Sequence, residues 1–212
     1  MSGMRQAPAI GFFVAGTILM VTLWQHELLL LALMSAASGL LLWMDGWKRT
    51  KHFLIATFIG GACENLAVAM GGWHYANAGF LFAPLWLPVG WGMAVVLLDE
   101  AFGTRAPAKA SKPSVALAFI GTIGAGVTFQ SELSLFFAFA LATIGLFLAG
   151  YHRKQDVFPG VMAALLGTGM ETACIIAGNW HYSAAMFGTP LWLPLCWFNA
   201  FLIMRRAMRV AD

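Results

Sequence analysis

Two glutamates stand out as candidate acids, because each lies inside a long apolar stretch that contains no lysine or arginine. Glu64 and Glu171 each come nine residues before the tryptophan of a Trp-His-Tyr triplet. A carboxyl group that an apolar pocket keeps neutral can act as an acid, and a carbon–carbon double bond is one weak base it can protonate. The sequence therefore predicts Glu64 and Glu171 as catalytic acids. A structural hydrogen bond between helices is the alternative.

Each triplet is followed by a Pro-Leu-Trp-Leu-Pro box, so residues 72–91 and 178–197 are rich in aromatic rings. The face of an aromatic ring attracts a cation, by about 2 kcal/mol when both are shielded from water. A carbocation formed on a protonated double bond needs such walls. An aromatic belt at the membrane interface is the alternative. The predicted substrate-binding aromatics are Trp73, Tyr75, Trp86, Trp91, Trp180, Tyr182, Trp192 and Trp197.

The central residues of the two triplets are His74 and His181, which we include among the candidate catalytic residues. A histidine pair also suggests a metal or a bis-histidine haem. The Glu-x-x-His spacing of di-iron bundles does not occur in the chain, however. We therefore expect neither a metal nor a cofactor.

Two polar pairs begin further apolar stretches, and both resemble helix starts. A glutamate in the first turn of a helix is stabilised by the positive end of the helix dipole, which is the simplest role for these acids. The alternative is a polar vestibule that contacts the substrate. The pairs are Gln25 with Glu27, and Gln130 with Glu132.

The composition is that of a membrane protein. Hydrophobic residues make up 60% of the 212 residues, charged residues only 10%, and the mean hydropathy is +0.78. About 20 apolar residues in a helix cross the hydrocarbon core, and open sheets cannot do so. We predict eight transmembrane helices, at residues 7–24, 27–44, 53–71, 85–102, 113–130, 133–150, 158–178 and 190–207.

The basic residues define the predicted topology, because all twelve fall on one side of these eight spans. By the positive-inside rule, that side and both termini are cytoplasmic. The net charge of +3 is then an insertion signal, and we expect no nucleic-acid partner. We predict a multi-pass protein of the inner (plasma) membrane. The residues are Arg5, Lys48, Arg49, Lys51, Arg105, Lys109, Lys112, Arg153, Lys154, Arg205, Arg206 and Arg209.

The chain repeats itself at an offset of 105 to 107 residues, as the glutamates, triplets and boxes show. Such a period indicates duplication of one helical unit. The halves are residues 1–103 and 104–212. Because four spans return the chain to its starting side, both halves have the same orientation, related by a pseudo-twofold axis along the membrane normal. The predicted fold is an all-α polytopic membrane protein built from two parallel four-helix repeats.

A resemblance to a known family rests on the acid-Gly-Trp-Tyr pattern. Glu64-x-x-Ala67-x-x-x-Gly71-x-Trp73-x-Tyr75, and its copy from Glu171 to Tyr182, resemble the pattern of the integral-membrane carotenoid cyclases, which also carry it in duplicated helical halves. The Pro-Leu-Trp-Leu-Pro-x-x-Trp segment is more similar to the related membrane carotenoid hydratases. The cyclases place paired glutamates after the proline, where this chain has Trp-Leu-Pro.

This resemblance and the residue chemistry favour a membrane-embedded enzyme that modifies an isoprenoid or carotenoid. The reaction would be acid-initiated cyclisation, hydration or isomerisation, and the greasy substrate would enter from the bilayer. Two alternatives stay open. One is a proton-coupled small-molecule transporter or channel, since intramembrane acids also serve transport. The other is a non-catalytic membrane protein that binds a lipid or a quinone.

Overall fold

The computed structural model describes residues 6–79, 81–103, 113–115, 118, 121, 124, 131–183, 185 and 188–210. The predicted span 113–130 lies largely outside the described residues. The elements are mostly helical: α1 (Gln6–Leu23), α2 (Glu27–Met44), α3 (Thr50–Ala69), β1 (Trp73–Tyr75), α4 (Leu87–Phe102), α6 (Glu132–Leu148), α7 (Lys154–Ile176), β2 (Trp180–Tyr182) and α8 (Leu193–Val210).

Four of the helices in the described part of the chain, α1, α2, α3 and α7, are long and apolar enough to cross a membrane. The shorter α6 is also apolar. Large apolar side chains are exposed on their outer faces, for example Phe58 on α3 and Ile176 on α7. In water such surfaces would be unfavourable, but in lipid they are solvated. The chain is therefore a predominantly helical membrane protein.

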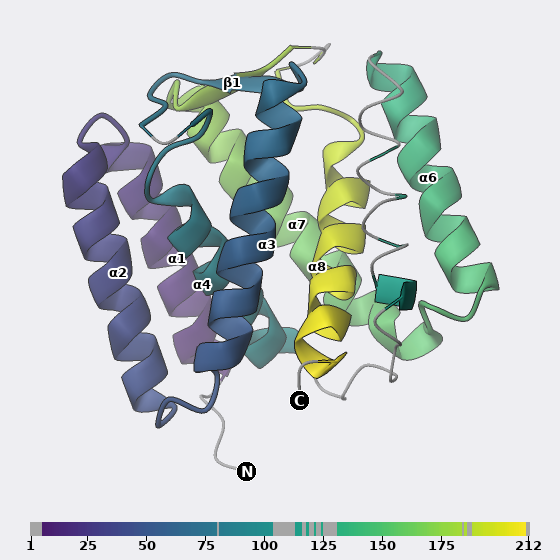
Figure 1. Ribbon diagram of the computed structural model, residues 1–212, viewed down its shortest axis with the longest axis horizontal. Coiled ribbons are helices and arrows are strands. Elements are labelled where there is room, and N and C mark those ends of the chain that lie inside the picture. The colour runs from purple at the N-terminus through teal and green to yellow at the C-terminus, as the bar shows by residue number, and fades with distance from the viewer. Residues whose placement is uncertain are drawn as a thin grey trace.

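The helices pack as a bundle around α3, α4, α7 and α8 (Figure 1). Helices α1 and α2 cover one side of this central group, and α6 flanks the other side, against α8. Strands β1 and β2 lie across one end of the bundle, which we call the ribbon end. The first and last described residues lie at the opposite end, which we call the charged end.

Helices α3 and α7 end in the same kind of turn. Gly71 and Gly178 follow the last helical residues with positive φ angles of 80° and 82°, which glycine adopts at little cost. The next amide closes the turn in each case: Gly72 N donates to the Ala67 carbonyl and Asn179 N to the Cys174 carbonyl, both at 3.0 Å. These turns send the chain into β1 and β2.

The two strands pair with each other across a separation of more than a hundred residues. They are antiparallel, with Trp73 opposite Tyr182, His74 opposite His181, and Tyr75 opposite Trp180. The sequence predicts apolar segments that cap the bundle but does not predict strands. Three residues are too few for an alternating pattern to be visible, and the pairing forms only once α3 and α7 lie near each other.

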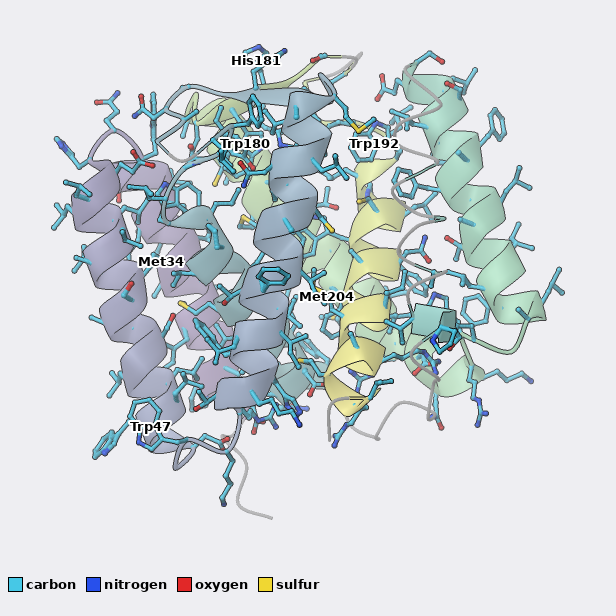
Figure 2. All side chains as sticks on the ribbon, viewed as in Figure 1. Met34, Trp47, Trp180, His181, Trp192 and Met204 are labelled. Carbon is cyan, nitrogen blue, oxygen red and sulfur yellow. The ribbon has the colours of Figure 1, made fainter. Side chains whose placement is uncertain are left out.

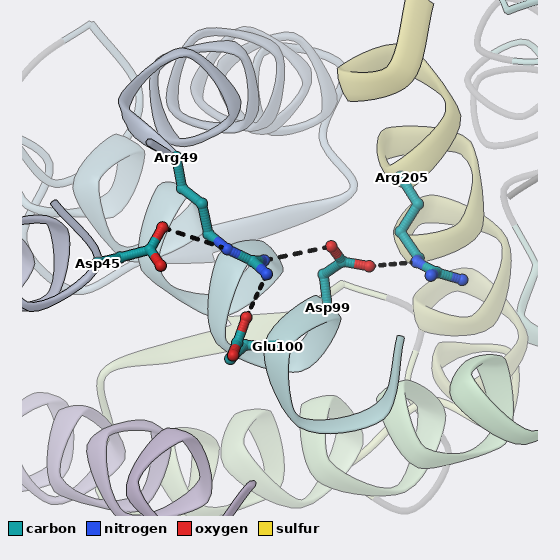
Figure 3. A network of polar contacts seen from close by, with 5 residues as sticks. All are labelled: Asp45, Arg49, Asp99, Glu100 and Arg205. Carbon is teal, nitrogen blue, oxygen red and sulfur yellow. Dashed lines mark hydrogen bonds and ion pairs between the residues drawn. The ribbon is translucent and has the colours of Figure 1, made fainter. Parts of the chain in front are cut away.

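The charged end is held together by buried and partly buried ion pairs (Figure 3). Arg205 of α8 binds Asp99 of α4 at 2.5 Å, and Arg49 also approaches Asp99, at 3.4 Å. Beside them Arg206 binds Asp156 at 2.8 Å, and both side chains are only 2% exposed. The sequence predicts these arginines as topology signals only. The structure shows that Arg205 and Arg206 also join α8 to α4 and α7.

Candidate functional site

The carboxylate of Glu64 on α3 is surrounded by donors from its own half of the chain. Its Oε2 accepts hydrogen bonds from Trp73 Nε1 at 3.1 Å and Tyr75 Oη at 2.9 Å. Its Oε1 accepts one from Trp91 Nε1 at 3.0 Å. Glu64 therefore connects α3 to β1 and to α4.

Glu171 on α7 makes the corresponding contacts in the second half. Its Oε2 accepts a hydrogen bond from Tyr182 Oη, and its Oε1 accepts one from Trp197 Nε1 at 2.6 Å. The side chain is buried. Glu171 thus connects α7 to β2 and to α8.

The aromatic donors of the two glutamates also contact each other across the halves. The Trp91 and Trp197 rings stack, with centroids 4.9 Å apart and planes 19° from parallel. Trp73 meets Tyr182 at 5.2 Å, and Tyr75 meets Trp180 at 5.4 Å. These six rings form one aromatic cage around both carboxylates.

A cavity of about 50 Å³ lies beside the cage, between α1, α4 and α7. Its wall on α4 runs from Leu87 to Leu97, a length of roughly 15 Å at the rise of an α-helix. The described lining is mostly apolar, and its polar atoms come from Glu64, Glu171, Thr17 and Tyr75 and from the indole groups of its tryptophans. Four flexible side chains allow the cavity to widen: Met20, Met34, Met93 and Met170.

The structure brings most of the predicted aromatic residues to this site. Tyr75, Trp86, Trp91, Trp180 and Trp197 line the cavity together with the two glutamates. Trp73 and Tyr182 stand behind them as members of the cage. Trp192 lies further away, where it stacks on Phe139 and meets the edge of Tyr182.

The histidines of the triplets lie elsewhere. Neighbouring residues of a strand point to opposite faces, so His74 and His181 point away from the cage whose rings flank them. Both are exposed, and Figure 2 shows His181 at the outer surface of the ribbon end. They do not reach the cavity, so their predicted catalytic role has no support in this geometry.

The polar pairs at the helix starts have a structural contact that the sequence does not reveal. Glu27 Oε1 accepts a hydrogen bond from Leu85 N at 2.5 Å, and Glu132 Oε1 accepts one from Leu191 N at 2.7 Å. Each glutamate therefore fixes a Pro-Leu-Trp-Leu-Pro box to the start of a helix. Gln25 is exposed at the turn between α1 and α2, and Gln130 lies outside the described residues.

The contribution of α1 to the cavity is the part that sequence reasoning missed. Phe13, Gly16, Thr17 and Met20 form one wall. These residues recur at spacings of three and four, so they share a face of the helix. In a membrane helix that is apolar all round, this face carries no visible signal beyond one glycine and one threonine.

A second polar cluster lies nearer the charged end, at the turn between α6 and α7. His152 is only 2% exposed, and its Nε2 lies 3.3 Å from Asn199 Oδ1. Asn199 in turn donates to Thr143 Oγ1 at 2.8 Å. Burial lowers the pKa of His152 to about 4, because the charged imidazolium would lose its hydration. His152 is therefore neutral at physiological pH.

This burial predicts an acid sensitivity of the fold. The unfolded chain binds a proton at His152 below its ordinary pKa of 6.5, whereas the folded chain does so only near 4. Protonation of His152 therefore leaves the free energy of unfolding unchanged above pH 6.5 and lowers it as the pH drops from 6.5 towards 4. His152→Gln keeps an amide donor for Asn199 and should flatten that fall in thermal unfolding scans in detergent. His26→Gln, at an exposed position, is the control. An unchanged acid profile in His152→Gln would contradict this assignment.

Comparisons with known proteins reveal a similarity of fold alone. Neither a scan of protein-family models nor a search of curated proteins found a match. Two solved structures are similar. One is a mycobacterial Insig homologue, MvINS from Mycobacterium vanbaalenii, with a TM-score of 0.58 and 20% identity over 75% of this chain and 92% of that chain. The other is a cross-linked trimer of a variant of MvINS, with a TM-score of 0.58 and 19% identity over 76% and 93%.

The chain therefore shares the fold of an Insig homologue, and the expectation of an isoprenoid- or carotenoid-modifying enzyme is wrong. The solved structures that resemble it are not carotenoid enzymes. The geometry gives a physical reason for the error. Oxygens of both carboxyl groups accept hydrogen bonds from indole and phenol groups of the chain itself. Glu64 and Glu171 are therefore the shared acceptors that hold the rings of the cage in place.

Proposed function

We propose that this protein is a non-catalytic membrane protein that binds a lipid in the cavity beside the aromatic cage. The observation that carries the proposal is the cavity itself. It has a volume of about 50 Å³, its wall is mostly apolar and includes four flexible methionine side chains, and helices from both ends of the sequence contribute to that wall. Ligand sites are typically apolar clefts with a few convergent polar groups, and Glu64 and Glu171 provide those groups here.

The polar end of the cavity favours a lipid that carries a hydrogen-bond donor. Each carboxylate oxygen has more than one lone pair, so Glu64 and Glu171 can accept a further bond from a hydroxyl or amine. The nearby donors Trp73, Tyr75 and Trp91 already give their hydrogens to Glu64.

The same lining favours binding over proton-coupled transport. Transport needs a polar path that reaches both faces, whereas the cavity continues from the glutamates along Phe13, Met93 and Leu97, all apolar. Closer to the charged end, the buried arginines are engaged in ion pairs with Asp99 and Asp156. A lipid chain would lie along the apolar wall with its polar group at the cage.

The proposed architecture is eight spans in two parallel four-helix repeats, with both termini cytoplasmic. Equivalent contacts in the two halves support the repeat: Glu64 and Glu171 bind equivalent aromatic donors, and Glu27 and Glu132 bind equivalent boxes. The basic residues at the charged end support the orientation. The plasma membrane is the proposed location.

Filling the cavity should displace the lipid. Gly16 faces it, and a Cβ at this position would lie 3.2 Å from Met93 Cε, so the side chain of Gly16→Leu would occupy the space. We expect mass spectrometry of the purified variant to find at most about a tenth of the lipid that the wild type retains. A tenfold weaker affinity corresponds to a loss of about 1.4 kcal/mol in binding free energy.

Gly11→Leu is the matched control. Gly11 lies on the same helix, and a Cβ there would meet nothing within 4 Å. This variant should retain its lipid like the wild type. Equal lipid content in Gly16→Leu and Gly11→Leu would contradict a binding site in this cavity.

A further inference from the structure

We propose that His74 and His181 bind one divalent transition-metal ion, Zn²⁺ or Cu²⁺, on the exposed face of the ribbon. The two histidines are far apart in sequence, and their spacing alone gives no metal signature. The strand register brings them directly opposite each other. Their imidazoles belong to different halves of the chain, so an ion between them would join the halves outside the membrane-embedded bundle.

The separation of the rings suits two ligands of one ion. Zinc binds histidine nitrogen at about 2.0–2.1 Å, which places the ring centres of two imidazoles on one tetrahedral ion about 5 Å apart. The centroids of the His74 and His181 rings are 5.4 Å apart, with planes inclined by 42°. Rotation about the side-chain bonds would turn one nitrogen of each ring towards a shared ion.

The backbone beneath the pair is held in place on both sides. Trp73 and Tyr75 flank His74 and are hydrogen-bonded to Glu64, and Tyr182 beside His181 is hydrogen-bonded to Glu171. The neighbouring cross-strand pairs are in ring contact. Little conformational freedom of the ribbon would therefore be lost on binding, which favours affinity.

Both histidines are exposed, so water can complete the coordination. Among the described residues, no group of three or more histidine, cysteine, aspartate or glutamate side chains could hold a metal. A site with two protein ligands binds an exchangeable ion more weakly than a closed structural site does.

Binding of Cu²⁺ to the full-length protein, purified in detergent without a histidine tag, tests the proposal by electron paramagnetic resonance. Wild type should bind one ion with two nitrogen ligands. His74→Gln and His181→Gln should each weaken binding by about tenfold or more, because the second imidazole acts at high effective concentration. His26→Gln, at another exposed position, should bind like the wild type. Zn²⁺ should raise the unfolding temperature of wild type and His26→Gln only.

The outcome that overturns the proposal is equally specific. If the double variant His74→Gln/His181→Gln binds Cu²⁺ as tightly as the wild type, with the same spectrum, the ion lies elsewhere. Loss of binding in His26→Gln would also overturn it. The lipid content of these variants should stay at the wild-type level, so failure of the metal site is distinguishable from failure of the lipid-binding proposal.

Discussion

Glu171→Ala is expected to lower the free energy of unfolding by about 4 kcal/mol, because it leaves two donors of the cage unpaired in an apolar surrounding at a cost of about 1–3 kcal/mol each. The donors are Tyr182 Oη and Trp197 Nε1. Truncation of the buried side chain also opens a void. An unfolding titration with a denaturing detergent in mixed micelles measures this loss.

Two further variants show whether hydrogen bonding is the cause. Glu171→Gln retains one carbonyl oxygen as an acceptor and should recover part of the stability. Gln155→Ala changes an exposed side chain at the start of the same helix and should have little effect. If Glu171→Ala unfolds at the same detergent fraction as Gln155→Ala, the hydrogen bonds to Glu171 do not stabilise the cage.

A single methyl group at Gly167 is expected to cost about 1–3 kcal/mol, the usual penalty for overpacking a core. A Cβ at this position would overlap the Trp197 indole, which packs directly on the α7 backbone. Trp197 would have to move, and with it the stack on Trp91 and the hydrogen bond to Glu171. Gly167→Ala should therefore both lower stability and reduce the lipid content.

Gly169, two residues further along the helix, provides the matched control. A Cβ there would meet nothing within 4 Å. Because alanine favours a helix over glycine by about 1 kcal/mol, Gly169→Ala should be neutral or stabilising. The two variants thus have opposite expected signs in the same unfolding titration. Equal stability of Gly167→Ala and Gly169→Ala would contradict the tight packing of α7 on α8.

The helices could be predicted from the sequence where long apolar runs define them. The predicted span 27–44 has the same bounds as α2, and α1 differs from its prediction by one residue at each end. Helix α7 begins four residues before the predicted start at 158. Its first turn is polar, and Asp156 caps it by accepting a hydrogen bond from Arg153 N at 2.9 Å. Hydropathy marks the apolar part of a helix and not its capped end.

Glu64, Glu171 and their aromatic partners could also be singled out from the sequence, because the same residues recur at the same spacing in both halves. Their role could not. A carboxyl group in an apolar stretch looks the same in sequence whether it is a free acid or the acceptor of several hydrogen bonds. That difference depends on where Trp91 and Trp197 point, which is decided by the packing of α4 and α8.

Long-range contacts account for the remaining gaps. The pairing of His74 with His181, the ion pair of Arg205 with Asp99 and the α1 wall of the cavity each join segments far apart in the chain. Residue type alone does not specify such partners. The basic residues illustrate the point, since the same arginine can serve insertion and also be buried in an ion pair.

The central claim is that a lipid occupies the cavity, and photo-crosslinking tests it most directly. Cells that express the protein would be supplied with a lipid precursor carrying a photoactivatable group, and crosslinked peptides would be mapped by mass spectrometry. The account predicts crosslinks at cavity residues such as Met20 and Met93, with the bound lipid chemically unchanged. Crosslinks confined to the exposed outer surface, at residues such as Phe58 and Leu165, would contradict it.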